Sequence, residues 1–594
     1  MKTKGTAVFL CLLFILMPFL EGNEFKFSHG NVGPNHTPID LPFVSNRYTC
    51  IGCVLMVTII EQLAQVHNNS VQEAMTTLCG YLPDYLNRLV LIITKEEARL
   101  RSTCIVLAEL FGPDLIKLIN HKLNADVICH AVQLCSNDPV QPFCHVFQKP
   151  KAGLKRSIKY AQWILKESSI MRNTEFLSLY LRKICNQPLL KGLCETKSSL
   201  PMLDIDQDNF SVFPSLRGYH WRGRDCNDTD NSFYPGRRPE DWDLIRDSNC
   251  NGIWGFDPED KIPYEKKFCD GTDSRGIMVL GDSAAAHFHI PPEWLTAINM
   301  SEQTFSNLPV AISNEFDWPQ LSMYTGYQNS TIGGWTESIY LQLRKNNLCN
   351  HRDYQNLAKN GYSSDNLRNT NSLSRDQELD KPAVVFYAVI GNDVCNSHAD
   401  TLKHMTTPKQ MKLNVMTTLE HLDTLLPKGS HVVLVALAAG HLLWDILHDK
   451  YHPIGQLNKD VTYNQLYGFL SCLESNPCEG WMNKNETLRN LTTERANQLS
   501  DVLKEIAVSQ KFHNFDVIYI GRIYERVFAK WRQMGKDPVD LIEPVDGFHP
   551  NQIASALGAD LIWKEVVNMR PEVFGKNNPY NEEITAIFGD QGGH

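Results

Sequence analysis

The spacing of hydrophobic residues changes along the chain and separates two kinds of predicted structure. In the N-terminal part, apolar residues recur at helical intervals, which predicts an amphipathic helix that includes Val54, Val57, Ile60 and Leu63. The C-terminal part instead has short apolar runs with the length of buried strands, at 277–280, 382–390, 431–439 and 515–520. An amphipathic helix is expected at 553–567. The pattern predicts an all-α domain followed by an α/β domain with a parallel sheet.

The N-terminus has the features of a secretory signal peptide. Two lysines precede an apolar run over 7–20, and small or polar residues follow it. The run, interrupted by Pro18, is too short to cross roughly 30 Å of hydrocarbon, and no later segment is expected to reach that length. We therefore predict a signal peptide at 1–22, a pro-segment at 23–45 and a soluble mature protein.

Composition and charge exclude several classes of protein. With 594 residues, the chain is long enough for about two to four domains. Its 43% of hydrophobic and 21% of charged residues are ordinary for a globular protein. A net charge of −10 argues against nucleic acid as the main partner, because phosphate binding requires a concentrated basic surface.

The cysteines and glycosylation motifs indicate an oxidising compartment. Of 17 cysteines, Cys11 lies in the predicted signal peptide, and the even number that remains is expected to form disulfides. Motifs for N-glycosylation occur at Asn35, Asn68, Asn299, Asn329, Asn485 and Asn490. These features predict entry into the secretory pathway.

Six cysteines lie on the predicted N-terminal helices. Cys50 and Cys53 are three residues apart and share one helix face. Together with Cys79, Cys104, Cys129 and Cys135, this spacing resembles that of a saposin-like domain, expected at 46–137. The resemblance implies the pairs Cys50–Cys135, Cys53–Cys129 and Cys79–Cys104, whereas the sequence alone leaves the pairing open. Residues 80–103 are longer than the corresponding saposin hairpin and are expected to be an insertion.

Residues 138–200 are expected to connect the two domains. They carry a run of basic residues, namely Lys149, Lys151, Lys155, Arg156 and Lys159. Three interpretations stay open for this run: a solvated helix face, a proteolytic processing site in an exposed linker, or a contact for an anionic headgroup.

Residues 201–260 are rich in Asp and Asn and predict calcium loops. Oxygen-bearing side chains alternate with other residues in three sets, as they do in calcium loops. The candidate ligands are Asp204, Asp206, Asp208, Phe210, Asp225, Asn227, Asp228, Asp230, Asp247, Asn249, Asn251 and Ile253. Each set lacks the glutamate at position 12 of an EF-hand, so looser calcium loops are expected, with plain polar turns as the alternative.

Four short blocks in the C-terminal half carry the candidate catalytic chemistry. Ser283 follows the first predicted strand and begins a helix, where exposed backbone N–H groups can stabilise an oxyanion. The other blocks are Asn356 to Gly361, Gly391-Asn392-Asp393 and Asp546-Gly547-Phe548-His549. In this order the blocks resemble the GDSL/SGNH hydrolase family, expected over 270–575 with a three-layer, flavodoxin-like α/β fold.

The GDSL/SGNH resemblance implies a role for each residue of the blocks. Ser283 is the expected nucleophile, His549 its general base and Asp546 the residue that orients the base. The backbone N–H groups of Ser283 and Gly361 and the side-chain amide of Asn392 are the expected oxyanion hole.

The remaining histidines are expected to be structural. His287 is close enough to Ser283 in sequence to compete as the base, but His549 is preferred for its Asp-Gly-Phe-His context. Zinc is not expected, because no HExxH motif or Cys/His cluster includes His287, His289, His441, His448 or His452.

The combination of the three segments suggests a substrate. With the stretches 218–225 and 589–594, it resembles a family of secreted esterases that remove secondary fatty acyl chains from the lipid A of bacterial lipopolysaccharide and so detoxify it. The resemblance implies capture of lipid from a membrane or micelle by the saposin-like domain. It also implies a zymogen cut into disulfide-linked small and large subunits, and an endosomal or lysosomal destination. A general phospholipase or lysophospholipase, or a lipid-binding protein with weak hydrolase activity, is the alternative.

Overall fold

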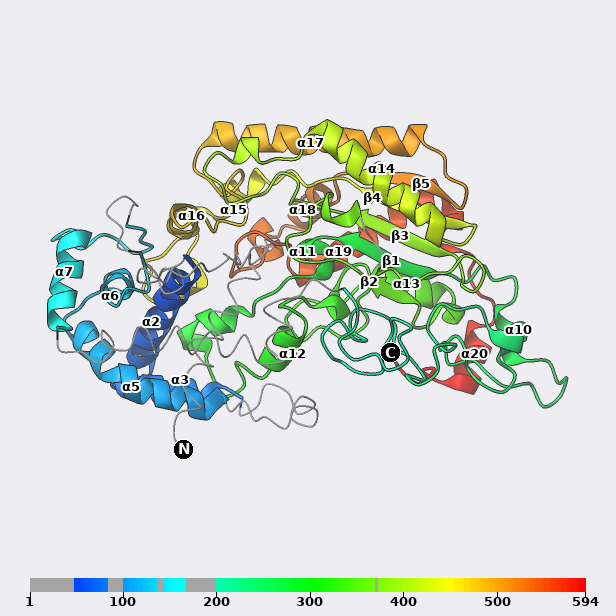
Figure 1. The fold of residues 1–594 in the computed structure, drawn as a ribbon, viewed down its shortest axis with the longest axis horizontal. Coiled ribbons are helices and arrows are strands. Elements are labelled where there is room, and N and C mark those ends of the chain that lie inside the picture. Colours follow the sequence, from blue (N-terminus) through cyan, green and yellow to red (C-terminus); the bar gives the residue numbers. More distant parts are fainter. Residues whose placement is uncertain (1–46, 84–99, 137–142, 167–198, 369–371) are drawn as a thin grey trace, which may run out of the picture.

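The protein is described by a computed structural model that covers residues 47–83, 100–136, 143–166, 199–368 and 372–594. A helical domain lies at one end and an α/β domain occupies the remainder (Figure 1). The helices are α2 (Arg47–His67), α3 (Val71–Tyr81), α5 (Leu100–Asn120), α6 (Ala125–Ala131), α7 (Leu154–Ile164), α10 (Tyr264–Cys269), α11 (Ser283–Ala286), α12 (Leu308–Ser313), α13 (Ile339–Asn346), α14 (Pro408–Leu425), α15 (Leu442–Leu447), α16 (Tyr463–Cys472), α17 (Glu486–Ser509), α18 (Ile523–Gln533), α19 (Gln552–Met569) and α20 (Asn581–Phe588). The strands are β1 (Gly276–Gly281), β2 (Tyr354–Asn356), β3 (Ala383–Ala388), β4 (Ser430–Val435) and β5 (Phe515–Ile520).

The helical domain is held together by the three disulfides that the saposin resemblance implied. Cys50 pairs with Cys135, Cys53 with Cys129, and Cys79 with Cys104. The last pair forms although an insertion separates its cysteines; the central part of that insertion, 84–99, lies outside the described residues. Helix α2 turns its predicted apolar positions inward, because Val54, Val57, Ile60 and Leu63 are all buried.

Helix α2 corrects one expectation from the sequence. The segment Thr49–His67 is long and apolar enough to cross a membrane, so the expectation that no segment after the signal peptide reaches that length was wrong. In the structure, however, 72% of the most apolar 18-residue stretch of this helix is buried inside the protein. The helix buries its apolar surface against its own domain and against the α/β domain. The side chain of Gln62 on α2 donates a hydrogen bond to the carbonyl of Ile454 in the α/β domain.

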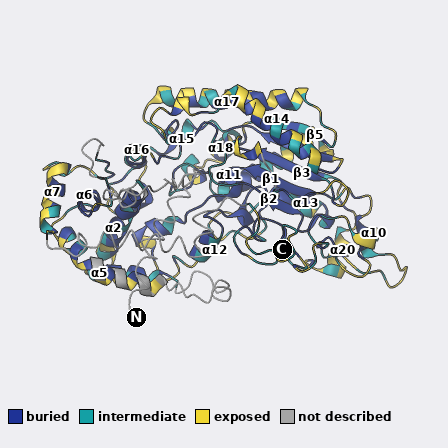
Figure 2. Cartoon of the chain, viewed as in Figure 1, coloured by how far each residue is buried: buried dark blue, intermediate teal, exposed yellow. Residues whose placement is uncertain are grey.

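The α/β domain is built on a five-stranded parallel sheet with the order β2-β1-β3-β4-β5. All residues of β1, β3 and β4 are buried, as parallel strands covered on both faces require (Figure 2). Alternate residues face opposite sides: Met278 and Val385 join the core beneath α14 and α17, whereas Ile277 and Phe386 join the core with α18 and α19. The predicted all-α domain and three-layer α/β domain are confirmed.

The Asp/Asn-rich segment covers the outer edge of this sheet. Over 201–260 it contains only one short 3-10 helix, Glu240–Asp243, among turns and loops. The N–H of Gly223 donates to the carbonyl of Tyr354, and the N–H of Asn356 donates to the carbonyl of Trp221. The loop therefore pairs with β2 and protects an edge strand that would otherwise present free backbone groups. The three-residue strand β2 is too short to show a periodic pattern in the sequence.

Candidate active site

Ser283 lies where β1 ends and the short helix α11 begins. Asp282 is the N-cap of α11, and its carboxylate accepts the N–H of Ala284 at 3.1 Å. The other oxygen of Asp282 accepts the N–H groups of Ile390 and Gly391, at 2.6 and 3.1 Å, from the end of the neighbouring strand β3. Burial raises the pKa of Asp282 to about 6. Asp282 thus joins two of the sequence blocks that are 108 residues apart.

The structure brings His549 and Asp546 to Ser283. The Nε2 atom of His549 lies 2.7 Å from the Oγ of Ser283, and its Nδ1 atom lies 2.5 Å from Oδ2 of Asp546. The other oxygen of Asp546 accepts the N–H groups of Phe548 and His549, which fixes the turn that carries both side chains. Burial alone would lower the pKa of His549, but the charge and hydrogen bond of Asp546 raise it above its usual value. This chain of contacts is the geometry of an activated serine.

Gly547 is required by the same turn. Its φ of 62° lies in the left-handed region, and a Cβ built there would lie 2.6 Å from the hydroxyl of Tyr467. That hydroxyl donates to the carbonyl of Gly547 at 2.9 Å. A glycine between Asp546 and the histidine therefore allows the turn to pack closely against α16.

The structure does not place His287 as a competing base. Its Nδ1 atom lies 3.1 Å from the hydroxyl of Ser555 on α19, and burial lowers its pKa to about 3.

A second pair of a histidine and a carboxylate, which sequence reasoning missed, lies next to the contacts of Ser283, His549 and Asp546. Nδ1 of His289 is 2.7 Å from Oε2 of Glu543, and both side chains are buried. The residues are 254 apart and match no short motif, so no sequence signal identifies them as a pair.

Two of the three expected oxyanion donors, Ser283 and Asn392, line the same cavity. The amide of Asn392 donates to the carbonyl of Tyr362 at 3.1 Å. Gly361, with a φ of 77°, lies in the turn that the N–H of Tyr362 closes by donating to the carbonyl of Lys359.

Two apolar cavities flank these residues. One, of about 80 Å³, has Ser283 and His549 in its wall beside mostly apolar side chains that include Leu443, Trp481, Phe528 and Phe548. The other, of about 120 Å³, lies between α2 and the α/β domain and reaches Asp546. Its wall includes Ile51, Leu55, Leu78, Trp294, Phe305 and Phe469. Both cavities have the chemistry of an acyl-chain site.

Two of the three Asp/Asn sets form one carboxylate cluster. Side-chain oxygens of Asp204, Asp206 and Asp228 lie within 4.8 Å of one another, as do those of Asp206, Asp208 and Asp225. One oxygen each of Asp206, Asp208, Asp225 and Asp228 is buried without a hydrogen-bond partner. Burial, together with neighbouring carboxylates, raises the pKa of Asp208 to about 8 and that of Asp225 to about 7. Converging carboxylate oxygens that lack hydrogen-bond partners fit a hard cation such as calcium.

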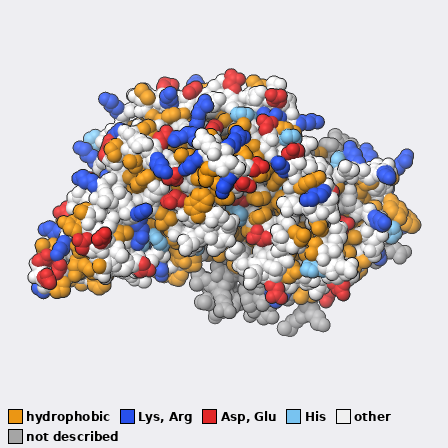
Figure 3. Space-filling view, turned by 180° about the vertical axis from the view of Figure 1, so that it is seen from behind, with side chains coloured by type: hydrophobic (Ala, Val, Ile, Leu, Met, Phe, Trp, Pro, Cys, Tyr) orange, Lys and Arg blue, Asp and Glu red, His pale blue; other side chains and the backbone are white. Residues whose placement is uncertain are grey.

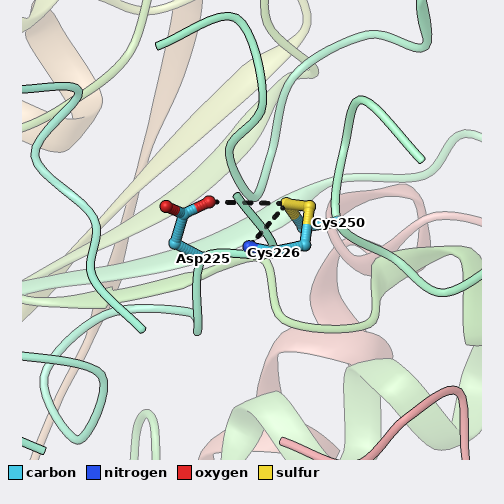
Figure 4. Close-up of side chains that lie close together, drawn as sticks. All are labelled: Asp225, Cys226 and Cys250. Atoms are coloured by element: carbon cyan, nitrogen blue, oxygen red, sulfur yellow. Dashed lines mark hydrogen bonds between the residues drawn. A yellow bond between two sulfur atoms is a disulfide. The ribbon is translucent and has the colours of Figure 1, made fainter. Parts of the chain in front are cut away.

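A disulfide holds one side of this cluster in place. Cys226 pairs with Cys250, and an oxygen of Asp225 lies 3.8 Å from the sulfur of Cys250 (Figure 4). Because both sulfurs are bonded to each other, they are not metal ligands here. The side-chain oxygens of Asn227 and Asp230 accept hydrogen bonds within their own loop, from Thr229 and Ser232 respectively.

The third Asp/Asn set is arranged differently. The carboxylate of Asp247 accepts the N–H groups of Asn251 and Gly252, and the amides of Asn249 and Asn251 donate to Glu265. Glu265 was missed in the sequence, because it lies 14 residues beyond Asn251 on helix α10. The carbonyl of Asn251 also accepts the side chain of Gln591, so the C-terminal tail lies against this loop.

The remaining disulfides join distant segments. Cys144, between α6 and α7 of the helical domain, pairs with Cys472 of the α/β domain, and Cys395 pairs with Cys478. A further pair, Cys269–Cys349, joins α10 to the segment before β2.

Asn35 lies outside the described residues, and the other five glycosylation motifs have exposed asparagines, at Asn68, Asn299, Asn329, Asn485 and Asn490.

Comparison with known proteins matches both domains. The family described as "Saposin-like domain" matches residues 49–195, and "GDSL-like Lipase/Acylhydrolase" matches 277–562. The chain is 54% identical to acyloxyacyl hydrolase of Oryctolagus cuniculus over 557 residues. It is 53% identical to acyloxyacyl hydrolases of Homo sapiens and Mus musculus, and each match covers 93% of this chain and 94% of the relative. The chain belongs to the acyloxyacyl hydrolase family.

Membership of the acyloxyacyl hydrolase family decides the class of activity. The chain is an esterase that removes acyl chains from lipids, and this function is favoured over the alternatives drawn from the sequence. Its seven disulfides among the described residues agree with the secretory pathway that such a saposin-like protein enters. The saposin-like match extends beyond the expected boundary at 137 and includes α7.

Proposed function

We propose that this chain hydrolyses the secondary, acyloxyacyl-linked fatty acyl esters of lipid A, with Ser283 as nucleophile. The observation that carries the proposal is the contact series from Ser283 through His549 to Asp546, at 2.7 and 2.5 Å. His549 takes the proton of the serine hydroxyl as Oγ attacks the ester carbonyl. It then returns the proton to the leaving alkoxide, and water releases the fatty acid from the acyl-serine by the reverse steps.

The oxyanion of the tetrahedral intermediate needs donors that are already in place. The N–H of Ser283, at the start of α11, and the amide of Asn392 are the proposed donors, because both line the cavity beside the nucleophile. Gly361 remains a predicted donor from the family resemblance, and the carbonyl of the next residue, Tyr362, accepts the amide of Asn392.

The substrate presents several acyl chains, and the enzyme has apolar space on both sides of the triad. The cavity at Ser283 suits the chain that is cleaved, and the cavity between α2 and the α/β domain suits a neighbouring chain held by the saposin-like domain. A Leu55→Gln change in the second cavity is expected to lower activity on lipopolysaccharide while leaving a soluble short-chain ester unaffected. Leu413→Gln, at an exposed site on α14, is the matched control. Equal loss on both substrates would instead assign α2 a purely structural role.

Calcium is the proposed cofactor, held by the cluster of Asp204, Asp206, Asp208, Asp225 and Asp228. Bound calcium would neutralise these carboxylates and keep the loop against the sheet edge. The third set, with Asp247, Asn249 and Asn251, is a further candidate site, to which Glu265 adds a carboxylate.

Processing into two subunits is also proposed. A cut within 167–198 would leave Cys144 on the small subunit and Cys472 on the large one, so their disulfide would hold the two together. The signal peptide and the glycosylation motifs support the proposed secretion and N-glycosylation, and the family resemblance supports an endosomal or lysosomal destination.

The test is to incubate the purified protein with lipopolysaccharide beside Ser283→Ala and to identify the released fatty acids by mass spectrometry. Wild type is expected to release only the secondary chains, and the variant to lose activity by a factor on the order of 10⁴ or more. Deacylation of phospholipids but not of lipopolysaccharide would favour a general phospholipase. Equal release by both proteins would rule out Ser283 as the nucleophile.

A further inference from the structure

Helix α7 carries an exposed face that the proposed ester hydrolysis does not use. The helix packs on α6 and α5 through its buried residues Leu154, Ile158 and Ala161. Its remaining surface faces solvent at the far end of the helical domain (Figure 1).

The first feature of this face is its charge. Between residues 149 and 166 the chain has no Asp or Glu. The exposed cations of this stretch are Lys149, Lys151, Lys155, Arg156, Lys159 and Lys166. None of them pairs with a carboxylate in the part of the chain that the structure describes, and the protein as a whole has a net charge of −10. Positive charge is thus gathered on α7, which carries Lys155, Arg156 and Lys159, and on the residues that flank it. Figure 3 shows Lys and Arg side chains beside hydrophobic ones at this end.

The second feature is a pair of exposed aromatic rings. Trp163 is 68% exposed and Tyr160 is 44% exposed, and their rings stack with centroids 6.0 Å apart. At about 100° per residue, Trp163 projects between Lys159 and Arg156 around the helix axis. Trp163 is more exposed than the other two exposed tryptophans, Trp254 at 52% and Trp335 at 45%.

From these features we propose that α7 docks the protein on an anionic lipid surface. Tryptophan and tyrosine side chains favour the headgroup level of a bilayer, and surrounding lysines favour its phosphates. A protein partner fits less well, because the centres of protein interfaces are depleted in lysine. The site deepens the proposed function by assigning how the enzyme holds a lipid aggregate, and it lies apart from the saposin disulfide framework that ends at Cys135.

The test measures sedimentation of the full chain with vesicles of phosphatidylcholine, alone or with about one-third phosphatidylglycerol. Ser283→Ala protein is used, so that binding is measured without hydrolysis. We expect binding to the anionic vesicles that weakens in high salt, and a loss of about fivefold for each cation removed in the double variant Lys155→Gln/Lys159→Gln. Trp163→Ala is expected to weaken binding as well.

The matched controls are Lys504→Gln/Lys511→Gln and Trp335→Ala, at exposed sites of the α/β domain, and they are expected to bind as the parent does. The same changes in wild type should leave hydrolysis of a soluble short-chain ester unchanged, which separates failure of docking from failure of the proposed function. Equal binding to both vesicle types, or no effect of the α7 variants, would overturn the proposal. So would binding of heparin without binding of vesicles, because that would identify a soluble polyanion as the partner.

Discussion

Glu543 contacts both His289 and His549, the histidine that lies against Ser283. Oε2 of Glu543 lies 2.7 Å from Nδ1 of His289, and the backbone N–H of Glu543 donates to the carbonyl of His549 at 2.8 Å. Burial raises the pKa of Glu543 above its usual value, although His289 opposes this effect. The negative charge of Glu543 in turn adds to that of Asp546 in raising the pKa of His549.

This arrangement predicts how Glu543→Gln changes the pH profile. His549 must be neutral to accept the serine proton, so activity falls as the pH drops through its pKa. Removing the Glu543 charge lowers that pKa, and the acidic limb of kcat/KM on a soluble ester is expected to move to lower pH. An acidic limb at the wild-type position would mean that Glu543 is uncharged in the active enzyme. Thermal unfolding of the same variant distinguishes a shifted profile from a damaged fold.

Asn392→Ala should remove one donor to the oxyanion. Because this donor acts on charge that develops only in the transition state, we expect kcat to fall by about 10²–10³ with little change in KM. Steady-state kinetics on a short-chain ester measure both constants. A fall confined to KM would show that the amide of Asn392 binds substrate rather than the oxyanion.

The carboxylate cluster predicts that the effect of calcium depends on pH. Without a cation, the pKa of Asp208 is about 8 and that of Asp225 about 7, both above the value near 4 of an unfolded chain. The folded loop therefore binds more protons than the unfolded one, and the stability that this contributes is lost as the pH rises toward 8. Calcium binds the deprotonated form, so its addition is expected to raise Tm more at about pH 8 than at about pH 5.

Scanning calorimetry with calcium or a chelator at the two pH values measures this difference. Saturating calcium is expected to add about 2–4 kcal/mol to the free energy of unfolding. Asp206→Asn should reduce the gain, whereas Asp501→Asn, at an exposed position of α17, should keep it. A gain that is the same at both pH values would contradict calcium binding by these carboxylates.

The disulfide Cys144–Cys472 makes a prediction about the processed protein. After a cut within 167–198, the two pieces should migrate together in non-reducing electrophoresis and separate on reduction. Cys472→Ser should separate them without reductant. Cys478→Ser breaks Cys395–Cys478 inside the α/β domain and serves as the control that leaves the pieces joined. Continued linkage in Cys472→Ser would assign the bridge to another cysteine.

Local sequence determined much of this protein. Helix α2, strands β1, β3, β4 and β5 and helix α19 lie close to the expected ranges, because each carries its own hydrophobic period. The roles of Asp546 and His549 came from the resemblance of the four blocks to the GDSL/SGNH family, and their three-residue spacing allows both side chains to lie on one turn. Family resemblance then supplied the saposin disulfides, which spacing alone leaves open.

Tertiary structure decided what depends on residues far apart in the chain. The pair of Glu543 and His289, the bridge from Cys144 to Cys472 and the apolar cavity between α2 and the α/β domain join segments that share no motif. A short motif determines only the backbone turn that contains it, whereas contacts between distant segments form when their buried faces pack together.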